Sequence, residues 1–242
     1  KNSEGIHDSL YAQVIFLNDS SSEIFLISLD LVAVDANFVQ EVREGIHTAL
    51  GIPQTSIMVS ATHTHSGPDG YANAFPRESK KTDEILRKIT TDKIVGAAQW
   101  AKATASEATI SFSTAHIDGI GLNRNDPQKK VDDTVSLIRI DSGKEPLAVL
   151  VNYACHPTVM SAENLQISAD LPGAARKFFN LHYPETVFMF LNGAAGDVST
   201  RFTRRFQGFE ELDRFGMILF GTVISLMQKM HELVDVHLRS QC

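Results

Sequence analysis

Two histidines separated by a single residue follow a short apolar run in this chain. His63 and His65 come directly after Ile57–Ala61, and Gly67-Pro68 then ends the strand in a turn. Side chains alternate along an extended segment, so both imidazoles are expected to point the same way. Imidazole nitrogens are common zinc ligands. The pair therefore predicts part of a metal site, and an exposed histidine pair in a loop is the alternative.

Other apolar runs also end in side chains that can do chemistry. Ligands of α/β sheets bind beyond the carboxyl ends of the strands, so several reactive strand exits together favour an enzyme. The Gly193–Gly196 run lets the backbone approach a ligand, and the N–H groups around Gly196 and Asp197 are candidates to bind a developing oxyanion. The exits are Asp30 after 23–29, His156 after 147–153, and Asp197 and Ser199 after 187–191.

Each of these side chains also has a purely structural interpretation. Asp30 is as well explained by a capped turn as by a site role. His156 is next to Pro157 and could be a packed core histidine, and Ser199 could be a surface hydroxyl. Asp170 is best interpreted as a helix N-cap. The remaining histidines have no comparable setting and are interpreted as surface or helix-face residues: His7, His47, His116, His182, His231 and His237.

Histidine with carboxylate suits zinc, and a catalytic zinc with an open position suits hydrolysis of an amide or ester. The common rival patterns are absent from the sequence. These are His-Glu-x-x-His, Gly-x-Ser-x-Gly, His-x-His-x-Asp-His, Gly-x-Gly-x-x-Gly and the P-loop.

Strand and helix signals alternate along the chain, without repeats or linkers, and predict one α/β domain with a mixed rather than purely parallel sheet. The long polar loops at 66–83 and 119–133 are candidates to face substrate. Strands are expected at 11–17, 23–29, 57–61, 109–117, 134–140, 147–153 and 187–191. Helices are expected from the Asp35 cap to Gly51, after 77–83 to about 105, over 174–182 and over 210–233.

Composition limits the function classes. The 242 residues suffice for a large core, with 43% hydrophobic and 21% charged residues. The net charge of −7 argues against a general nucleic-acid partner. No apolar run reaches the ~18–20 residues of a membrane span, and the polar start shows no signal peptide. Cys155 and Cys242 make no disulfide framework and leave the compartment open.

Taken together, the strand-exit segments resemble the neutral (non-lysosomal) ceramidase family, and the shorter bacterial homologues most. The match follows the family's order over nearly the whole chain. The matching segments are residues 5–12, 28–31, Thr62-His63-Thr64-His65-Ser66-Gly67-Pro68, Gly121-Leu122-Asn123-Arg124, 152–158, 168–173 and 192–199.

The resemblance implies a zinc-dependent amidase of sphingolipid metabolism that cleaves the N-acyl bond of ceramide, built as two sheets between helices and located in the periplasm or outside the cell. It implies that His63 and His156 bind zinc, and that His65 and Arg124 contact the substrate or the metal-bound water. Ser199 stands where the family has its catalytic serine, so that either this serine or the water attacks the carbonyl.

The family's further zinc ligands, a glutamate and a tyrosine, come from beyond its Gly-Asp-Val-Ser segment. No Glu or Tyr in the 43 residues after Ser199 matches them, and the family's first strand is also missing. We therefore expect residues 1–242 to be an incomplete N-terminal catalytic domain, with Asp30 as the nearest additional ligand or support for one. The alternatives are a metallohydrolase of a smaller amide or ester and a non-catalytic homologue. The oligomeric state is left open.

Overall fold

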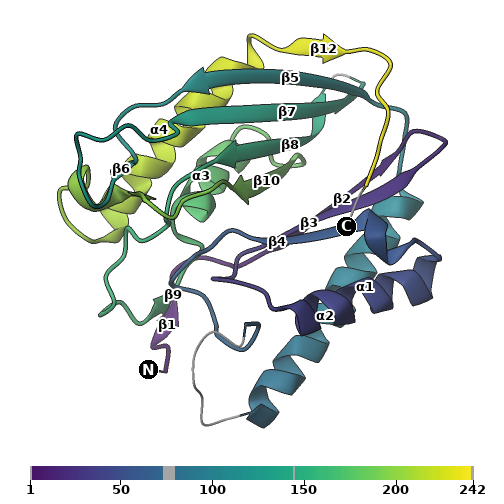
Figure 1. The fold of residues 1–242 in the computed structure, drawn as a ribbon, viewed down its shortest axis with the longest axis horizontal. Helices are drawn as coiled ribbons and strands as arrows, with labels where there is room; N and C mark the ends of the chain where they lie inside the picture. Colours follow the sequence, from purple (N-terminus) through teal and green to yellow (C-terminus); the bar gives the residue numbers. More distant parts are fainter. Residues whose placement is uncertain (1, 73–79, 144, 241–242) are drawn as a thin grey trace.

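A three-stranded sheet and two helices form the first half of the chain (Figure 1). The computed structural model describes residues 2–72, 80–143 and 145–240. Strands β2 (Ala12–Asn18) and β3 (Glu23–Leu29) pair as an antiparallel hairpin, and β4 (Ile57–Ala61) lies parallel to β3. Helices α1 (Ala36–Leu50) and α2 (Lys80–Ala103) cover the outer face of this sheet.

Local sequence explains the ends of α1. The Asp35 carboxylate accepts a hydrogen bond from the Phe38 backbone N–H, which caps the first turn. Gly51 takes φ 70°, a left-handed conformation that favours glycine, and its N–H bonds to the His47 carbonyl. The buried face of the helix packs on alternate residues of β3 in one apolar core, as the 3.6-residue spacing predicts; this core includes Phe25, Ile27, Leu29, Phe38, Val42 and Ile46.

A five-stranded sheet and two further helices form the second half. Its strand order is β10 (Val187–Asn192), β8 (Glu145–Tyr153), β7 (Thr134–Ser142), β5 (Thr109–His116) and β12 (His231–Leu233). The sheet is mixed, because β10 runs parallel to β8 and the other neighbours are antiparallel. Helices α3 (Asp170–Asn180) and α4 (Phe209–Met227) cover its outer face, and the shared core includes Val149, Val151, Phe179, Phe188, Phe190 and Phe215.

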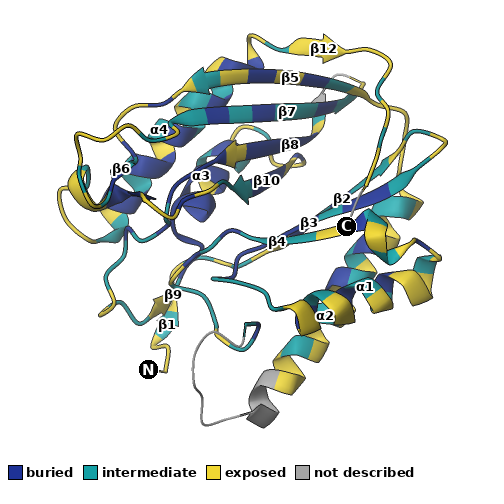
Figure 2. Cartoon of the chain, in the orientation of Figure 1, coloured by how far each residue is buried: buried dark blue, intermediate teal, exposed yellow. Residues whose placement is uncertain are grey.

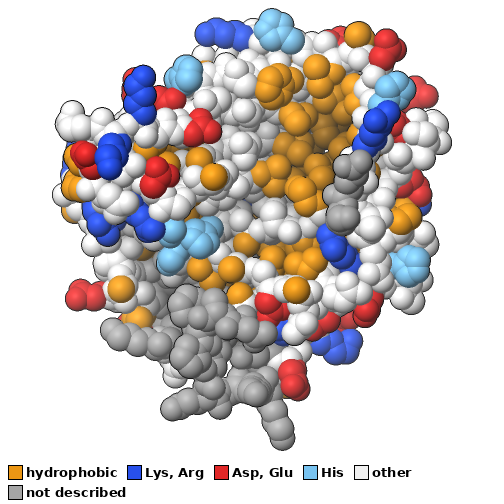
Figure 3. All heavy atoms as spheres, viewed as in Figure 1, with side chains coloured by type: hydrophobic (Ala, Val, Ile, Leu, Met, Phe, Trp, Pro, Cys, Tyr) orange, Lys and Arg blue, Asp and Glu red, His pale blue; other side chains and the backbone are white. Residues whose placement is uncertain are grey.

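The inner faces of the two sheets pack against each other through a third, smaller core. Ile15 of β2 lies there with Leu150 of β8 and Met189 of β10, and all three are buried (Figure 2). Away from β10, apolar side chains of the inner faces reach solvent, including Phe112 (37% exposed) and Met58 (41% exposed). Figure 3 shows a broad apolar area on this side of the molecule. The layering is helix, sheet, sheet, helix, which confirms the expected fold class.

The structure departs from the predicted elements in a few places. The last helix ends at Met227 instead of continuing to 233, and residues 231–233 form β12 on the free edge of β5. Two pairs of very short strands were not expected: β1 (Gly5–Ile6) with β9 (Gln166–Ile167), and β6 (Leu122–Asn123) with β11 (Val198–Ser199). Part of the polar loop at 66–83 lies outside the described residues. Among the described helices, none is long and apolar enough to span a bilayer.

Asp170 plays a different part from the one expected. It is the first residue of α3 and not its N-cap, with φ 52° and almost complete burial. Its carboxylate accepts hydrogen bonds from the backbone N–H groups of Leu171, Met160 and Val159. Asp170 therefore ties the loop after β8 to the start of α3.

Candidate metal centre

Three histidine rings from two loops meet at one end of the sheets. The Nε2 of His63 lies 3.1 Å from the Nε2 of His156 and 3.4 Å from the Nε2 of His65. One ring nitrogen of each lies within 4.8 Å of the others, and this is the one such histidine, cysteine or carboxylate group in the described part of the chain. The sequence predicted all three as site residues, and the structure brings them together.

The backbone around His63 is bent in order to present its ring. His63 has φ 72°, which is uncommon for a residue with a β-carbon. The two histidines thus point the same way from a turn instead of an extended strand. The His63 N–H bonds to the Leu31 carbonyl at 2.9 Å, and its Nδ1 lies 2.5 Å from the Val32 carbonyl. The loop after β3 therefore fixes both the backbone and the ring of His63.

His156 is held in the same manner by a different loop. Its backbone N–H bonds to the Val198 carbonyl at 2.8 Å, and its Nδ1 lies 3.1 Å from the Ala195 carbonyl. These residues belong to the segment after β10. The same segment pairs Ser199 with His156 along the backbone.

These contacts determine which nitrogens carry protons. A carbonyl oxygen only accepts, so the Nδ1 atoms of His63 and His156 must be the donors. In a neutral ring the Nε2 then bears a lone pair, and the two lone pairs face each other at 3.1 Å. Burial, followed by the nearby charges of His63 and Arg124, lowers the pKa of His156, and burial lowers the pKa of His65 to about 4. Two imidazole lone pairs that face each other at this distance fit a bound cation.

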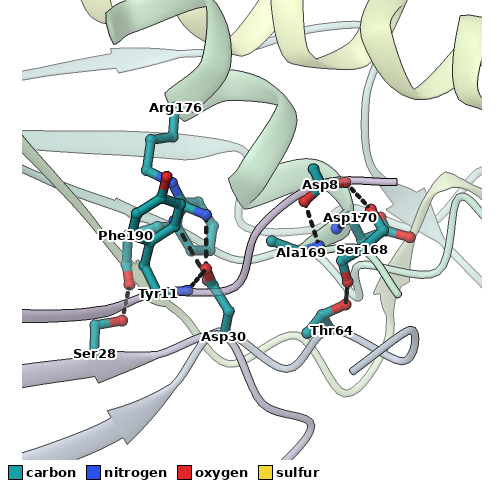
Figure 4. A network of polar contacts seen from close by, with 10 residues as sticks. All are labelled: Asp8, Tyr11, Ser28, Asp30, Thr64, Ser168, Ala169, Asp170, Arg176 and Phe190. Atoms are coloured by element: carbon teal, nitrogen blue, oxygen red, sulfur yellow. Dashed lines mark hydrogen bonds and ion pairs between the residues drawn. The ribbon is translucent and has the colours of Figure 1, made fainter. Parts of the chain in front are cut away.

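The turn between the two histidines is anchored through Thr64 (Figure 4). Thr64 is fully buried, and its hydroxyl donates to the Ser168 carbonyl at 2.7 Å. The Ser168 hydroxyl donates to Asp8 at 2.5 Å, and the other oxygen of Asp8 accepts the Ala169 N–H at 2.8 Å. The N-terminal segment thus supports the histidine turn through two polar links.

Asp30 does not join the histidine group. It forms a buried ion pair with Arg176 at 2.6 Å, and the same oxygen also accepts the Tyr11 N–H at 2.9 Å (Figure 4). The Tyr11 ring lies 4.6 Å from the Arg176 guanidinium. Asp30 instead starts the turn that supplies the Val32 carbonyl to His63, so its contribution to the site is indirect.

Of the remaining predicted residues, Gly196, Asp197 and Ser199 lie in the segment that supports His156, and Arg124 is hydrogen-bonded to that segment. The Arg124 N–H bonds to the Asp197 carbonyl at 2.7 Å, and the Asn123 side chain bonds to the Asp197 carboxylate at 3.0 Å. Gly196 and Asp197 are exposed, whereas Ser199 is only 4% exposed. The Ser199 hydroxyl accepts the Arg201 N–H at 3.3 Å. The oxyanion role of this loop stays a prediction, because its described contacts to the site use carbonyl groups.

Known proteins that resemble this chain belong to one family. The family model for the N-terminal region of neutral/alkaline non-lysosomal ceramidases matches residues 1–204. A neutral ceramidase of Mycobacterium tuberculosis is 29% identical over 76% of this chain and 31% of its own length. Neutral ceramidase 2 of Arabidopsis thaliana is 25% identical over 81% of this chain and 28% of its own.

Solved structures share the fold at lower sequence identity. A ceramidase complexed with C2 superposes with a TM-score of 0.81 at 19% identity, covering 94% of this chain and 40% of its own. The neutral ceramidase of Pseudomonas aeruginosa gives 0.79 at 20% identity, covering 93% and 40%. Compared with the two curated relatives above, the chain spans about a third of their length. Because the family model matches most of its residues, the chain belongs to the neutral/alkaline non-lysosomal ceramidase family.

Proposed function

We propose that the chain is the N-terminal part of a zinc-dependent hydrolase that cleaves the N-acyl amide bond of ceramide. The observation behind this proposal is that three histidine rings lie together. Two of them are held by hydrogen bonds from Nδ1 to backbone carbonyl groups. Family membership supports the hydrolase class.

The donor set suits zinc. His63 and His156 would hold the ion through Nε2, because their other nitrogens are fixed by the Val32 and Ala195 carbonyls. His65 is more exposed and would be either a third ligand or a contact to substrate. A bound zinc ion polarises a carbonyl group and lowers the pKa of a water molecule.

The protein's own groups would orient the reacting amide. Arg124 would bind the acyl oxygen, and its charge is close enough to lower the pKa of both His65 and His156. Burial lowers the pKa of His65 to about 4, so its ring is unprotonated near neutral pH and would accept a hydrogen bond from the attacking group. Ser199 would act beside the scissile carbonyl, next to His156.

A lipid substrate is favoured over a smaller one by the apolar inner faces of the sheets. Met58 and Leu191 lie on the strands that lead to His63 and to the segment after β10. A series of N-acyl substrates of increasing chain length tests this choice. We expect kcat/KM to rise with chain length for a lipid site, since each buried methylene contributes about 0.8 kcal/mol. A flat series would favour the smaller substrate.

Zinc binding is tested by metal analysis of the purified chain after reconstitution. We expect about one zinc ion per chain, lost in His63→Ala and in His156→Ala. His116→Ala is the matched control, because His116 is an exposed histidine on β5 paired with Asp133. Absence of zinc from the unmodified chain, or equal zinc affinity in His63→Ala, would contradict the proposal.

A further inference from the structure

The histidine cluster joins two sheets, so its geometry depends on what connects them. His63 follows β4 of the three-stranded sheet, whereas His156 follows β8 of the five-stranded sheet. Their Nε2 atoms are nevertheless 3.1 Å apart. Among the strands of the second sheet, β10 has the backbone that comes nearest to β2, β3 and β4, so it is well placed to set this spacing.

Asn192, the last residue of β10, is hydrogen-bonded to both histidine loops. Its Nδ2 donates to the carbonyl of Thr62, the residue before His63, at 3.1 Å. Its Oδ1 accepts the N–H of Cys155, the residue before His156, at 3.3 Å. One rigid planar amide thus connects the backbones that carry the two rings.

The chemistry of this connection requires a primary amide. A carboxylate of the same length could accept from Cys155 but could not donate to the Thr62 carbonyl, and an aliphatic side chain could do neither. The next residue is Gly193, whose N–H bonds to the Tyr153 carbonyl at 3.0 Å. A β-carbon there would lie 2.9–3.2 Å from atoms of Ala154, so the strand end runs very close to the His156 loop.

We propose that Asn192 is a positioning residue that sets the separation of His63 and His156 and thereby the metal affinity of the site. This inference rests on the proposed zinc site and adds a residue that touches neither the metal nor the substrate. Loss of the amide leaves each histidine attached to its own sheet by its carbonyl partner, but removes the direct link between the two loops.

Ser28 provides a matched control for the loss of a hydrogen bond between the sheets. It is fully buried in β3, and its hydroxyl donates to the Phe190 carbonyl of β10 at 2.5 Å (Figure 4). Its side chain contacts β10 two residues before Asn192 and reaches neither histidine loop through a described hydrogen bond. Ser28→Ala therefore weakens the junction of the sheets and spares the link between His63 and His156.

The experiment compares Asn192→Ala, Asn192→Leu and Ser28→Ala in the whole chain. Leu has the branched shape of Asn without its polar atoms and leaves no cavity, so it separates loss of the amide from formation of a cavity. Zinc affinity is measured by competition with a chelator, and the stability of the metal-free proteins by urea unfolding. We expect the Asn192 variants to bind zinc about 10- to 100-fold more weakly, as for other residues that orient metal ligands. Ser28→Ala should lose stability and keep its zinc affinity within about twofold, since the ligand contacts are intact.

Crystal structures of the metal-free variants supply a second readout. The separation of the two Nε2 atoms should increase by about 1 Å in the Asn192 variants and stay unchanged in Ser28→Ala. Unchanged separation, or zinc affinities that follow stability equally in all three variants, would overturn the inference. If the unmodified chain binds no zinc, the proposed function fails, and the histidine separation still decides the role of Asn192.

Discussion

Replacing Arg176 by Met tests how strongly the buried ion pair supports the site. The side chains of Arg176 and Asp30 are 6% and 0% exposed, and the two charges are 2.6 Å apart. Met retains most of the length and apolar stem of Arg but leaves the Asp30 carboxylate with the Tyr11 N–H as its remaining described partner. Removal of one partner of a buried pair typically costs about 3–5 kcal/mol. We expect a loss of that size in the free energy of unfolding.

Urea unfolding at neutral pH, followed by circular dichroism, measures this loss. The double variant Asp30→Asn/Arg176→Met is the key control, because it also removes the unpaired charge. We expect it to recover a substantial part of the stability, since replacing both members of a buried pair is often close to neutral. Exposed Lys88, which pairs with Asp92, offers a surface comparison at which Lys88→Met should change stability by less than about 1 kcal/mol.

A loss below about 1 kcal/mol for Arg176→Met would refute this reasoning, since it would mean that the pair is no more important than a surface ion pair. Zinc affinity in the same variant addresses the link to the site. Asp30 begins the turn that holds the Nδ1 of His63 through Val32, so affinity should also decrease.

Three further predictions follow from the described contacts. Burial raises the pKa of Asp170 from 3.8 to about 6, so the folded state binds the proton of this carboxyl group more tightly than the unfolded state. The free energy of unfolding should therefore fall by about 3 kcal/mol as the pH rises from about 4 to 6. In Asp170→Asn, urea unfolding curves should not show this pH dependence. A β-carbon on Gly216 would lie 2.6 Å from that of Ala174, so Gly216→Ala should push α4 away from α3 and lower the free energy of unfolding by about 1–3 kcal/mol, measured as a lower melting temperature. Gly221→Ala, with open space around it, should be neutral or stabilising. Ser199→Ala should reduce amide hydrolysis about 100-fold and leave zinc affinity unchanged; equal reductions in both would assign the hydroxyl a structural role.

The long elements were predictable because their periodicity is set by burial on one face. The β2–β3 hairpin and the capped helix α1 are examples, with Asp35 and Gly51 at its two ends. The wrong end of the last helix has a tertiary cause. Residues 231–233 gain backbone hydrogen bonds by adding to the edge of β5, and a pairing between distant segments leaves no local pattern.

The histidines of the site could be predicted, whereas their supports could not. A histidine at a strand exit is visible in the sequence, and the three that were predicted as site residues lie together in the structure. The Val32 and Ala195 groups act through backbone carbonyls, so their side chains carry no signal. Thr64 and Asn192 do have suitable side chains, but their partners are 104 and 130 residues away. Asp30 was expected to be a ligand or to support one because its ion-pair partner, Arg176, is also distant in the sequence.

The division of the fold into two consecutive stretches has a consequence for folding. Residues 12–103 build the first sheet with α1 and α2, and residues 109–233 build the second sheet with α3 and α4. Each stretch can collapse on its own core, through contacts close in sequence. His63 and His156 are 93 residues apart and belong to different stretches. The histidine cluster therefore requires the two layers to be docked: a chain with both sheets formed but not packed against each other would lack the cluster.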